Sequence, residues 1–479
     1  MGMVEQLLVG GDRISPKSGK QSELIDPATG EAWIAIAAGN ADDIDFAVQC
    51  ANEARSQWRK MNSRDRTQVL HRLANLIREN LETLAQLESR NAGKPIRDAR
   101  DEVNLAADCF DYYAGAINKF GGQTIPVAAA GTSLTFREPI GVCGLIAPWN
   151  FPIVITAWKV APALAMGNTI VLKPATQTPL TALKLGELAL EAGVPPGVFN
   201  VVPGSGTEAG EALVRHPLVR KVSFTGSTEI GTQVMKLAAD DIKRVTLELG
   251  GKSANLIFAD ADLETAVPKS IWSGLGNAGQ DCCARSRILV DRAIYPVFLE
   301  QLIAQFQTLK LGKPSDEATE IGCLISKQHR DRVHEYVEIG KSEGAKLVCG
   351  GDFPTGEPFE TGAYLEPTIF ANVDAKMRIA QEEIFGPVVC VIPFSSEEEA
   401  VAIANDSLYG LSGSIWTRDI SRALRVAKAI ETGVLSINTG HSVHLEAPFG
   451  GVKRSGLGRE LGLNVLDHYS EFKSIFIAE

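Results

Sequence analysis

The sequence is poor in the features that mark nucleic-acid-binding, membrane-spanning and metal-binding proteins. Of its 479 residues, 47 are Lys or Arg and 58 are Asp or Glu, giving a formal net charge of −11. That balance argues against nucleic-acid binding, which needs a basic surface. No apolar run has the length of a membrane span. The cysteines show no C-x-x-C spacing, so we expect neither a metal site nor a disulfide framework.

Targeting signals are also missing from the first residues. The segment 1–11 has neither the basic start nor the apolar stretch of a secretory signal peptide. Gln6 stands where a myristoylation motif needs Ser or Thr. We therefore expect a reduced, cytoplasmic protein. What is present is ordinary for a globular chain, with 45% hydrophobic and 22% charged residues, and the length predicts two or three domains.

The spacing of apolar residues predicts the helices and strands. They indicate one helix over 41–59 and a second over 69–87. From Gly141, apolar runs alternate with helical stretches, which predicts βαβ units around a parallel sheet. The runs are 141–147, 169–173, 198–202, 221–224 and 245–249, and the helical stretches lie near 156–166, 180–193, 207–215 and 228–239. A second α/β stretch extends from Glu248 to about residue 446. The segment 121–139 and the tail after about 465 favour β structure and could pair as an arm.

Three segments could carry chemistry. In 277–284 (NAGQDCCA), Cys282 follows a Gly-containing turn, a setting that suits a thiolate nucleophile beside an oxyanion hole, although a buried structural cysteine is the commoner case. Glu248 ends an apolar strand before two glycines. Apolar surroundings would raise its pKa towards that of a general base, whereas a plain strand-end carboxylate is the alternative. Asn150, between prolines, could donate to an oxyanion or simply shape a turn.

Two glycine patterns compete for a phosphate contact. The segment 204–210 (GSGTEAG) follows a strand, but its last gap is one residue longer than in G-x-G-x-x-G. The segment 226–231 (GSTEIG) also lies at a strand-to-helix turn. Ser227 can cap the following helix there, and the N-terminus of that helix would attract a pyrophosphate. We favour the second pattern.

Together these segments resemble the aldehyde dehydrogenase superfamily over nearly the whole chain. Further family-like stretches are Asp26-Pro27-Ala28-Thr29-Gly30, Gly93-Lys94-Pro95, Ala192-Gly193-Val194-Pro195-Pro196-Gly197-Val198, Glu382-Glu383-Ile384-Phe385-Gly386-Pro387, Pro448-Phe449-Gly450-Gly451 and Gly456-x-Gly458-Arg459-Glu460. The resemblance implies that Cys282, rather than its neighbour Cys283, is the nucleophile. It also implies that Glu248 is the base for thioester hydrolysis and Asn150 the oxyanion donor, helped by the backbone N–H of Cys282.

The resemblance further implies NAD or NADP as the cofactor. Glu383 would bind the nicotinamide ribose, with Phe385 beside the ring, and Lys173 would contact the adenosine ribose. Ser227 and Trp149 are expected at the pyrophosphate, and Thr176, Gly226 and Gly251 complete the expected cofactor site. Many NAD-preferring relatives carry Glu where this chain has Thr176, so we expect NADP to be accepted.

The resemblance also implies an α/β fold with three parts. A dinucleotide-binding domain (1–120 and 140–247) and a catalytic domain (248–446) are expected, with an oligomerisation arm (121–139 and 465–479). The segment 447–464 would return to the cofactor domain. Relatives assemble through that arm, which predicts a homodimer or homotetramer.

Substrate choice is the least determined feature. The positions that line the family's substrate tunnel are Phe151, Ile155, Trp158, Val443 and Phe449 here, and no Arg stands at 153, 154, 155 or 158 to hold a carboxylate. We therefore expect a neutral apolar or aromatic aldehyde. His441 and His444 either contact substrate or are partly exposed loop residues. Two alternatives are a CoA-acylating enzyme, whose relatives typically lack the Glu base, and a non-catalytic relative.

Overall fold

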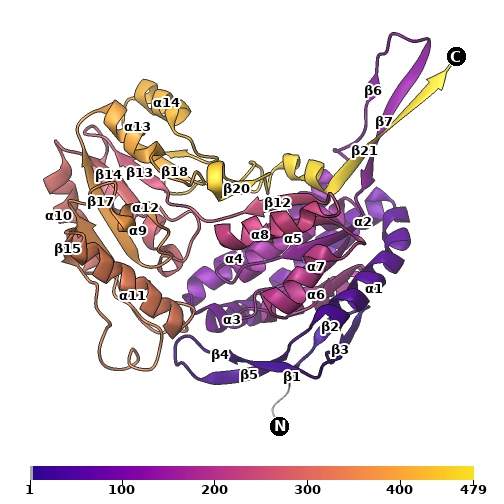
Figure 1. The fold of residues 1–479 in the computed structure, drawn as a ribbon, viewed down its shortest axis with the longest axis horizontal. Helices are drawn as coiled ribbons and strands as arrows, with labels where there is room; N and C mark the ends of the chain where they lie inside the picture. Colours follow the sequence, from indigo (N-terminus) through magenta and orange to yellow (C-terminus); the bar gives the residue numbers. More distant parts are fainter. Residues whose placement is uncertain (1–3) are drawn as a thin grey trace.

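A computed structural model describes residues 4–479, and its first body is built on an eight-stranded sheet (Figure 1). The strand order is β20-β12-β11-β8-β9-β10-β2-β3. Five central strands pair in parallel, and they coincide with the five predicted apolar runs: β8 (Val142–Ile146), β9 (Thr169–Lys173), β10 (Phe199–Val201), β11 (Val219–Thr225) and β12 (Arg244–Glu248). Antiparallel β20 (Gly456–Leu457), β2 (Leu7–Val9) and β3 (Asp12–Ile14) extend the edges.

Helices follow these strands where the sequence predicts them. They are α5 (Pro152–Ala165), α6 (Leu180–Ala192), α7 (Glu211–Arg215) and α8 (Thr228–Ala239), with a π-helical turn η1 (Gly206–Gly210) before α7. The sheet edge that carries Thr225 and Glu248 is therefore the carboxyl edge, where open α/β sheets bind ligands. No helix in residues 4–479 combines the length and the apolarity needed to cross a bilayer.

Within residues 4–116 the chain also forms a small three-stranded sheet and four helices. β1 (Val4–Glu5), β5 (Ala32–Ala37) and β4 (Gln21–Ile25) form a separate sheet. The helices are α1 (Ala41–Lys60), α2 (Ser63–Glu79), α3 (Leu81–Ala92) and α4 (Ile96–Ala116). The prediction of one helix over 69–87 is wrong, because Asn80 leaves helical geometry (φ −99°, ψ 17°). The backbone N–H and the side-chain Nδ2 of Asn80 both donate to the Leu76 carbonyl, at 3.1 and 2.9 Å.

A second, seven-stranded sheet forms the other body (left in Figure 1). Its order is β15-β16-β17-β14-β13-β18-β19, with mainly parallel pairing. The strands are β13 (Ala254–Ile257), β14 (Arg287–Asp291), β15 (Lys346–Cys349), β16 (Thr368–Ala371), β17 (Val388–Phe394), β18 (Gly413–Trp416) and β19 (Ser436–Ile437). The helices are α9 (Leu263–Leu275), α10 (Tyr295–Phe306), α11 (Lys327–Ser342), α12 (Arg378–Gln381), α13 (Glu397–Asn405) and α14 (Ile420–Ala429). Each sheet has its own apolar core.

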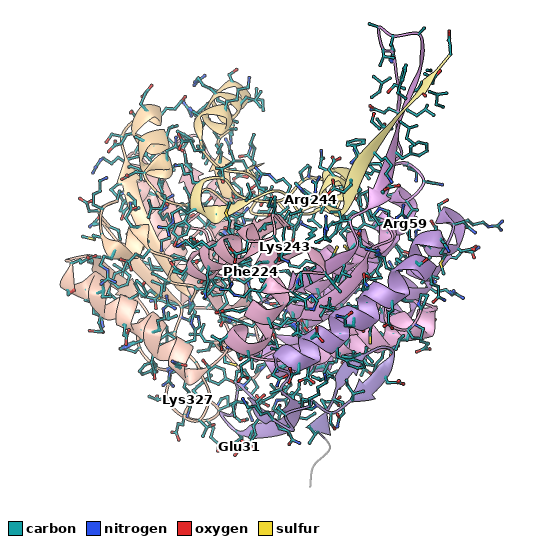
Figure 2. The ribbon with its side chains drawn as sticks, turned by 45° about the vertical axis from the view of Figure 1, so that its right-hand side comes forward. Glu31, Arg59, Phe224, Lys243, Arg244 and Lys327 are labelled. Carbon is teal, nitrogen blue, oxygen red and sulfur yellow. The ribbon has the colours of Figure 1, made fainter. Side chains whose placement is uncertain are left out.

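A three-stranded ribbon projects from the molecule (upper right in Figure 1). It consists of β6 (Thr124–Ile125), β7 (Gly131–Pro139) and β21 (Ser470–Ala478), in the order β21-β7-β6. Ion pairs hold its base: Arg59 with Glu138 at 3.0 Å and Arg244 with Glu471 at 2.5 Å, with both arginines labelled in Figure 2. The β prediction for the start of the tail is wrong, because η4 (Leu463–Tyr469) is a 3-10 helix. Its Val465, Leu466 and Tyr469 are buried in the core.

Candidate active site

Cys282 follows a turn in which two residues have left-handed backbone conformations. After α9 comes the 3-10 turn η2 (Gly276–Gly279), in which Asn277 and Ala278 have φ values of 53° and 55°. Cys282 is partly exposed, whereas Cys283 is 4% exposed and packs in a small apolar cluster. A hydrogen bond with Cys283 and burial raise the pKa of the Cys282 thiol. The nucleophile therefore needs a proton acceptor before it can react as a thiolate.

Asn150 is fixed against the nucleophile loop. It is 4% exposed and lies between β8 and α5. Its side-chain Nδ2 donates to the Gln280 carbonyl at 3.0 Å, and its own carbonyl accepts a hydrogen bond from Asn277 Nδ2 at 2.9 Å. An amide nitrogen carries two hydrogens, so one N–H of Asn150 is left for an oxygen bound beside Cys282.

Glu248 ends β12 as a buried carboxylate without a partner. It is 4% exposed, and neither carboxylate oxygen has a hydrogen-bond partner among residues 4–479. Burial, followed by the negative charge of Glu460, raises its pKa well above the usual value. Gly450 has φ +149°, and a Cβ there would lie 2.5 Å from Glu248 Oε1, so a side chain at 450 would strain the backbone and push the Glu248 carboxylate aside. The raised pKa has the direction that a general base needs.

A cavity of about 450 Å³ opens in front of Cys282. All five tunnel residues named from the sequence line it: Phe151, Ile155, Trp158, Val443 and Phe449. The rings of Trp158 and Phe449 pack at 5.4 Å between centroids. Glu248 is not among the lining residues, so in this arrangement its carboxylate is withdrawn from the cavity.

Sequence reasoning missed several residues of this wall. They are Glu102, Leu105, Val154, Lys269, Trp272, Ser273, Asp281, Arg285 and Ser442. Arg285 is 4% exposed, and its guanidinium donates to Ser414 Oγ at 3.1 Å and to the Cys283 carbonyl at 3.3 Å. A third hydrogen bond reaches Ser442 Oγ at 2.5 Å. Three of the five N–H donors of Arg285 are therefore bound to protein oxygens, and the one to Ser442 holds the loop that carries His441.

The two loop histidines differ in position. His441 is exposed at the mouth of the cavity and lines it, whereas exposed His444 does not. Their rings lie 5.1 Å apart. Burial and the neighbouring His444 lower the pKa of His441, which favours its neutral form near neutral pH.

A second cavity, of about 390 Å³, lies at the carboxyl edge of the first sheet. Trp149, Lys173, Thr176, Gly226 and Ser227 all line it. Ser227 caps α8 by accepting a hydrogen bond from Ile230 N at 3.3 Å, as predicted. The two glycine segments do not compete, because residues 206, 210 and 226 line the same cavity.

The residues of this cavity fit the adenosine half of a dinucleotide. Burial lowers the pKa of Lys173 to about 8, and within the described part of the chain its Nζ donates a hydrogen bond to the neighbouring Pro174 carbonyl alone, at 3.0 Å. An oxygen-rich ligand would supply the missing partner. Thr176 Oγ1 donates to the Gly204 carbonyl at 3.1 Å. Glu211, which sequence reasoning missed, also lines the cavity and accepts a hydrogen bond from Gln233 at 2.9 Å.

Glu383, Gly251 and Phe385 lie between this second cavity and Cys282. Glu383 Oε1 accepts the Gly251 N–H at 3.0 Å, and burial raises the pKa of Glu383 to about 7. A Cβ on Gly251 would lie 2.5 Å from the Cys282 carbonyl oxygen. The rings of Phe385 and Trp149 lie 5.3 Å apart. His329 Nε2 contacts the Phe385 carbonyl at 2.7 Å, a further neighbour that the sequence did not indicate.

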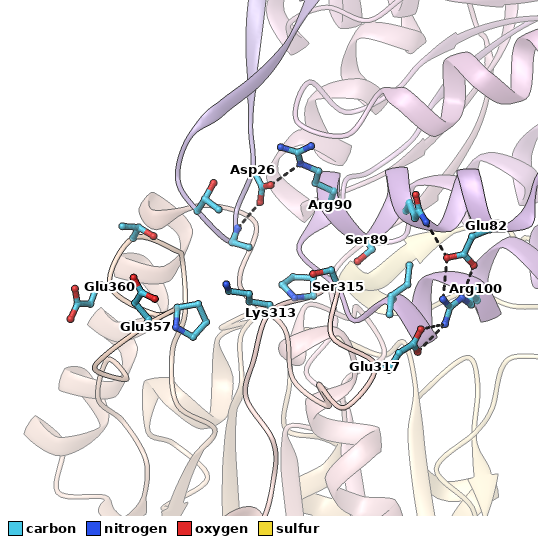
Figure 3. Close-up of a pocket in the computed structure, with 17 residues that line it drawn as sticks. Asp26, Glu82, Ser89, Arg90, Arg100, Lys313, Ser315, Glu317, Glu357 and Glu360 are labelled. Carbon is cyan, nitrogen blue, oxygen red and sulfur yellow. Dashed lines mark hydrogen bonds and ion pairs between the residues drawn. The ribbon is translucent and has the colours of Figure 1, made fainter.

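A larger cavity elsewhere lacks comparable chemistry (Figure 3). It measures about 680 Å³ and lies where 26–29 and 82–100 meet 313–317 and 357–361. Its charged side chains are largely paired: Asp26 with Arg90 at 2.8 Å, and Arg100 with Glu82 and Glu317, both at 2.8 Å. No cysteine is among its lining residues. The chemistry of the walls, and not cavity size, therefore identifies the site at Cys282.

Comparisons with known proteins agree with this geometry. A profile of the aldehyde dehydrogenase family matches residues 14–475. The chain is 43% identical over 478 residues to a betaine aldehyde dehydrogenase of Bacillus subtilis (strain 168), covering 99% of this chain and 97% of the relative. The crystal structure of Staphylococcus aureus betaine aldehyde dehydrogenase in complex with NAD+ superposes with a TM-score of 0.97 at 38% identity, covering 98% and 94% of the two chains. PnpE in complex with nicotinamide adenine dinucleotide superposes with a TM-score of 0.98 at 43% identity, covering 99% and 98%.

Proposed function

Because the chain belongs to the aldehyde dehydrogenase family, we propose that it oxidises an aldehyde to the carboxylic acid, with a nicotinamide dinucleotide as hydride acceptor. One observation carries the proposal. Cys282 lines an apolar cavity, the Asn150 side chain is hydrogen-bonded to the Gln280 carbonyl two residues before Cys282, and the group around Glu383 connects Cys282 to the second cavity. A nucleophile, an oxyanion donor and a cofactor site thus converge.

The reaction follows from these positions. The Cys282 thiol first loses its proton to a water molecule. The thiolate then adds to the aldehyde carbon, and the carbonyl electrons move to the oxygen, which the amide of Asn150 and the backbone N–H of Cys282 stabilise. The carbon is now tetrahedral and releases its hydrogen as hydride, which the bound nicotinamide accepts, leaving a thioester on Cys282. Glu248 takes a proton from water, the hydroxide attacks the thioester, and the acid leaves as the Cys282 thiolate is restored.

The second cavity would hold the cofactor. Lys173 would bind the adenosine ribose, while Ser227 and Trp149 would contact the pyrophosphate at the N-terminus of α8. Glu383 would bind the nicotinamide ribose, with Phe385 beside the ring. NAD+ in the structure of the Staphylococcus aureus relative supports this use of the fold.

Cofactor choice gives a first prediction. Thr176 contributes no charge, so a 2′-phosphate would meet Lys173 without opposition from that position, and we expect NADP to be used beside NAD. Thr176→Glu should raise the NAD-over-NADP ratio of kcat/KM about tenfold or more, which corresponds to ~1.4 kcal/mol of differential binding. Steady-state kinetics with both cofactors, and fluorescence titration with NADH and NADPH, measure the ratio.

Glu211 supplies the matched variant for this experiment. Its carboxylate lines the same cavity and opposes a 2′-phosphate, so Glu211→Gln should move the ratio in the opposite direction. If the wild type shows no NADP activity, or if Thr176→Glu leaves the ratio unchanged, then Thr176 is a neutral replacement in an NAD enzyme.

The substrate cavity supports a neutral apolar or aromatic aldehyde. Phe151, Trp158, Trp272 and Phe449 supply aromatic surface. The carboxylate of Glu102 is already paired with buried Lys94. An aldehyde with a quaternary ammonium group is a second candidate, because aromatic faces attract such cations and two of the similar proteins are named betaine aldehyde dehydrogenases.

A panel assay tests these alternatives. NADH and NADPH formation with hexanal, benzaldehyde and betaine aldehyde, each with and without CoA, separates substrate class from acyl acceptor. A higher kcat/KM for hexanal or benzaldehyde supports the proposal, and a higher value for betaine aldehyde supports the second candidate. Turnover that requires CoA would contradict hydrolysis by Glu248.

The arm gives a second prediction. β21 pairs with β7 along its whole length, and Phe472, Ile475, Phe476 and Ile477 are exposed. A projecting ribbon with exposed apolar side chains suits assembly with a second copy. Deleting 470–479 should therefore yield smaller particles by light scattering, with little change in NADH affinity. Ser474→Ala, which keeps every strand hydrogen bond, is the control, and an unchanged particle size after the deletion refutes the role of the arm.

A further inference from the structure

The segment Gly93-Lys94-Pro95, between α3 and α4, places a lysine behind the active site. The Lys94 side chain is 0% exposed. Its Nζ donates to the two carboxylate oxygens of Glu102 at 2.6 and 2.5 Å, and to the Asn150 carbonyl at 2.8 Å. It also lies 4.7 Å from the centre of the Phe151 ring. The Lys94 ammonium group thus contacts Glu102 of α4, the oxyanion donor Asn150 and the wall residue Phe151.

The backbone on either side of Lys94 is anchored to the second body. Gly93 has φ +79°, and a Cβ there would lie 2.6 Å from Cys323 Sγ. The Gly93 carbonyl accepts the Cys323 N–H at 3.1 Å, and Ile96 N donates to the Pro314 carbonyl at 2.8 Å. Lys94 is therefore held at the seam between the two bodies, with little freedom to move away from Asn150.

Two buried carboxyl groups lie beside Lys94. Both oxygens of Glu102 accept hydrogen bonds from Lys94, and burial raises the pKa of Glu102 to about 8 and also raises the pKa of Glu88. Glu88 accepts hydrogen bonds from Ile153 N at 2.9 Å and Thr181 Oγ1 at 2.7 Å. The Asn150 carbonyl is the neutral group that Lys94 Nζ holds, at 2.8 Å.

Lys94 is not among the residues that line the substrate cavity, so it does not touch substrate. We propose that Lys94 is a positioning residue for the oxyanion donor: its ammonium group holds the Asn150 carbonyl, and this fixes the direction of the Asn150 side-chain amide, which lies against the Gln280 carbonyl in the loop that carries Cys282. The inference rests on the proposed function of Asn150. A sub-ångström displacement of an oxyanion donor lowers the reaction rate, because an N–H group stabilises the oxyanion only when it points at the oxygen.

Lys94→Met tests the proposal in two backgrounds. In an otherwise wild-type enzyme, kcat should fall roughly tenfold or more while KM changes little, because transition-state stabilisation alone is lost. Removing an oxyanion donor costs on the order of 10²- to 10³-fold, so Asn150→Ala should leave measurable activity. In that background Lys94→Met should have little further effect, because the group through which Lys94 acts is gone.

Lys243 offers a matched control for the loss of a buried lysine. Its side chain is 1% exposed, and its Nζ donates to the backbone carbonyls of His216 at 2.6 Å and Val219 at 2.9 Å. It precedes β12, at the opposite end of the strands from Glu248. Lys243→Met should lower the melting temperature and leave kcat within a few-fold. Should Lys94→Met not fold, Lys94→Gln serves for the same comparison.

The outcomes separate this inference from the proposed function. The positioning role is overturned if Lys94→Met lowers kcat by the same factor in both backgrounds. It is also overturned if the variant changes KM alone. A wild type that oxidises no aldehyde, or an Asn150→Ala variant with normal kcat, overturns the proposed function itself.

Discussion

Cys282→Ala is expected to abolish aldehyde oxidation, with kcat/KM falling by on the order of 10⁴ or more, as when a covalent nucleophile is removed. The variant has no sulfur to attack the carbonyl, so no carbon becomes tetrahedral and able to release hydride. Cofactor binding should persist, because the adenosine cavity lies on the other body. Reduced-cofactor formation under saturating aldehyde measures the loss, and fluorescence titration with NADH checks the binding.

Cys283→Ala is the matched control. Cys283 is adjacent in sequence, but it is 4% exposed and packs with Leu411, Phe449 and Leu461. Its N–H donates to Asp281 Oδ1 at 2.8 Å through the backbone, and alanine keeps this contact. Most activity should remain. An inactive Cys283→Ala beside an active Cys282→Ala would show that the nucleophile is misassigned.

Glu248→Gln should stall the enzyme at the thioester. Glutamine keeps the shape of the side chain but cannot take a proton from water, and a general base contributes roughly 10²- to 10⁴-fold. Stopped-flow measurements should show a burst of reduced cofactor followed by turnover slowed to that extent. Intact-mass analysis should then detect an acyl group on Cys282. Normal steady-state turnover would exclude Glu248 as the base.

The pH dependence follows from the direction of the pKa shift. Burial and Glu460 raise the pKa of Glu248, so the folded enzyme holds its proton at pH values where an exposed Glu has lost it. The basic form grows as pH rises, and deacylation in the wild type should therefore accelerate with pH. In Glu248→Gln, the slow deacylation rate should no longer show the pH dependence that the ionisation of this carboxyl produces. An identical pH profile in both would assign that ionisation to another group.

Much of the fold followed from local pattern. The five apolar runs after Gly141 became the five parallel strands, because buried parallel strands need continuous apolar residues and the turns between them carry Gly, Pro and Ser. The sequence does not indicate the break at Asn80, because the apolar spacing continues across it while the Asn80 backbone leaves helical geometry. The 3-10 helix over Leu463–Tyr469 was missed because burial in the first core, and not β preference, sets that backbone.

The residues that could react can be identified without a structure. The segments around Cys282, Glu248 and Asn150 are short, and their chemistry is readable from residue type and turn pattern. The surroundings of these residues depend on packing between distant parts of the chain. Lys94 behind Asn150, Glu211 in the cofactor cavity and the unpartnered state of Glu248 all arise where elements distant in the chain pack together. Local periodicity reports contacts within one helix or strand, whereas pKa values, cavity walls and the direction of a donor depend on neighbours that only packing brings near.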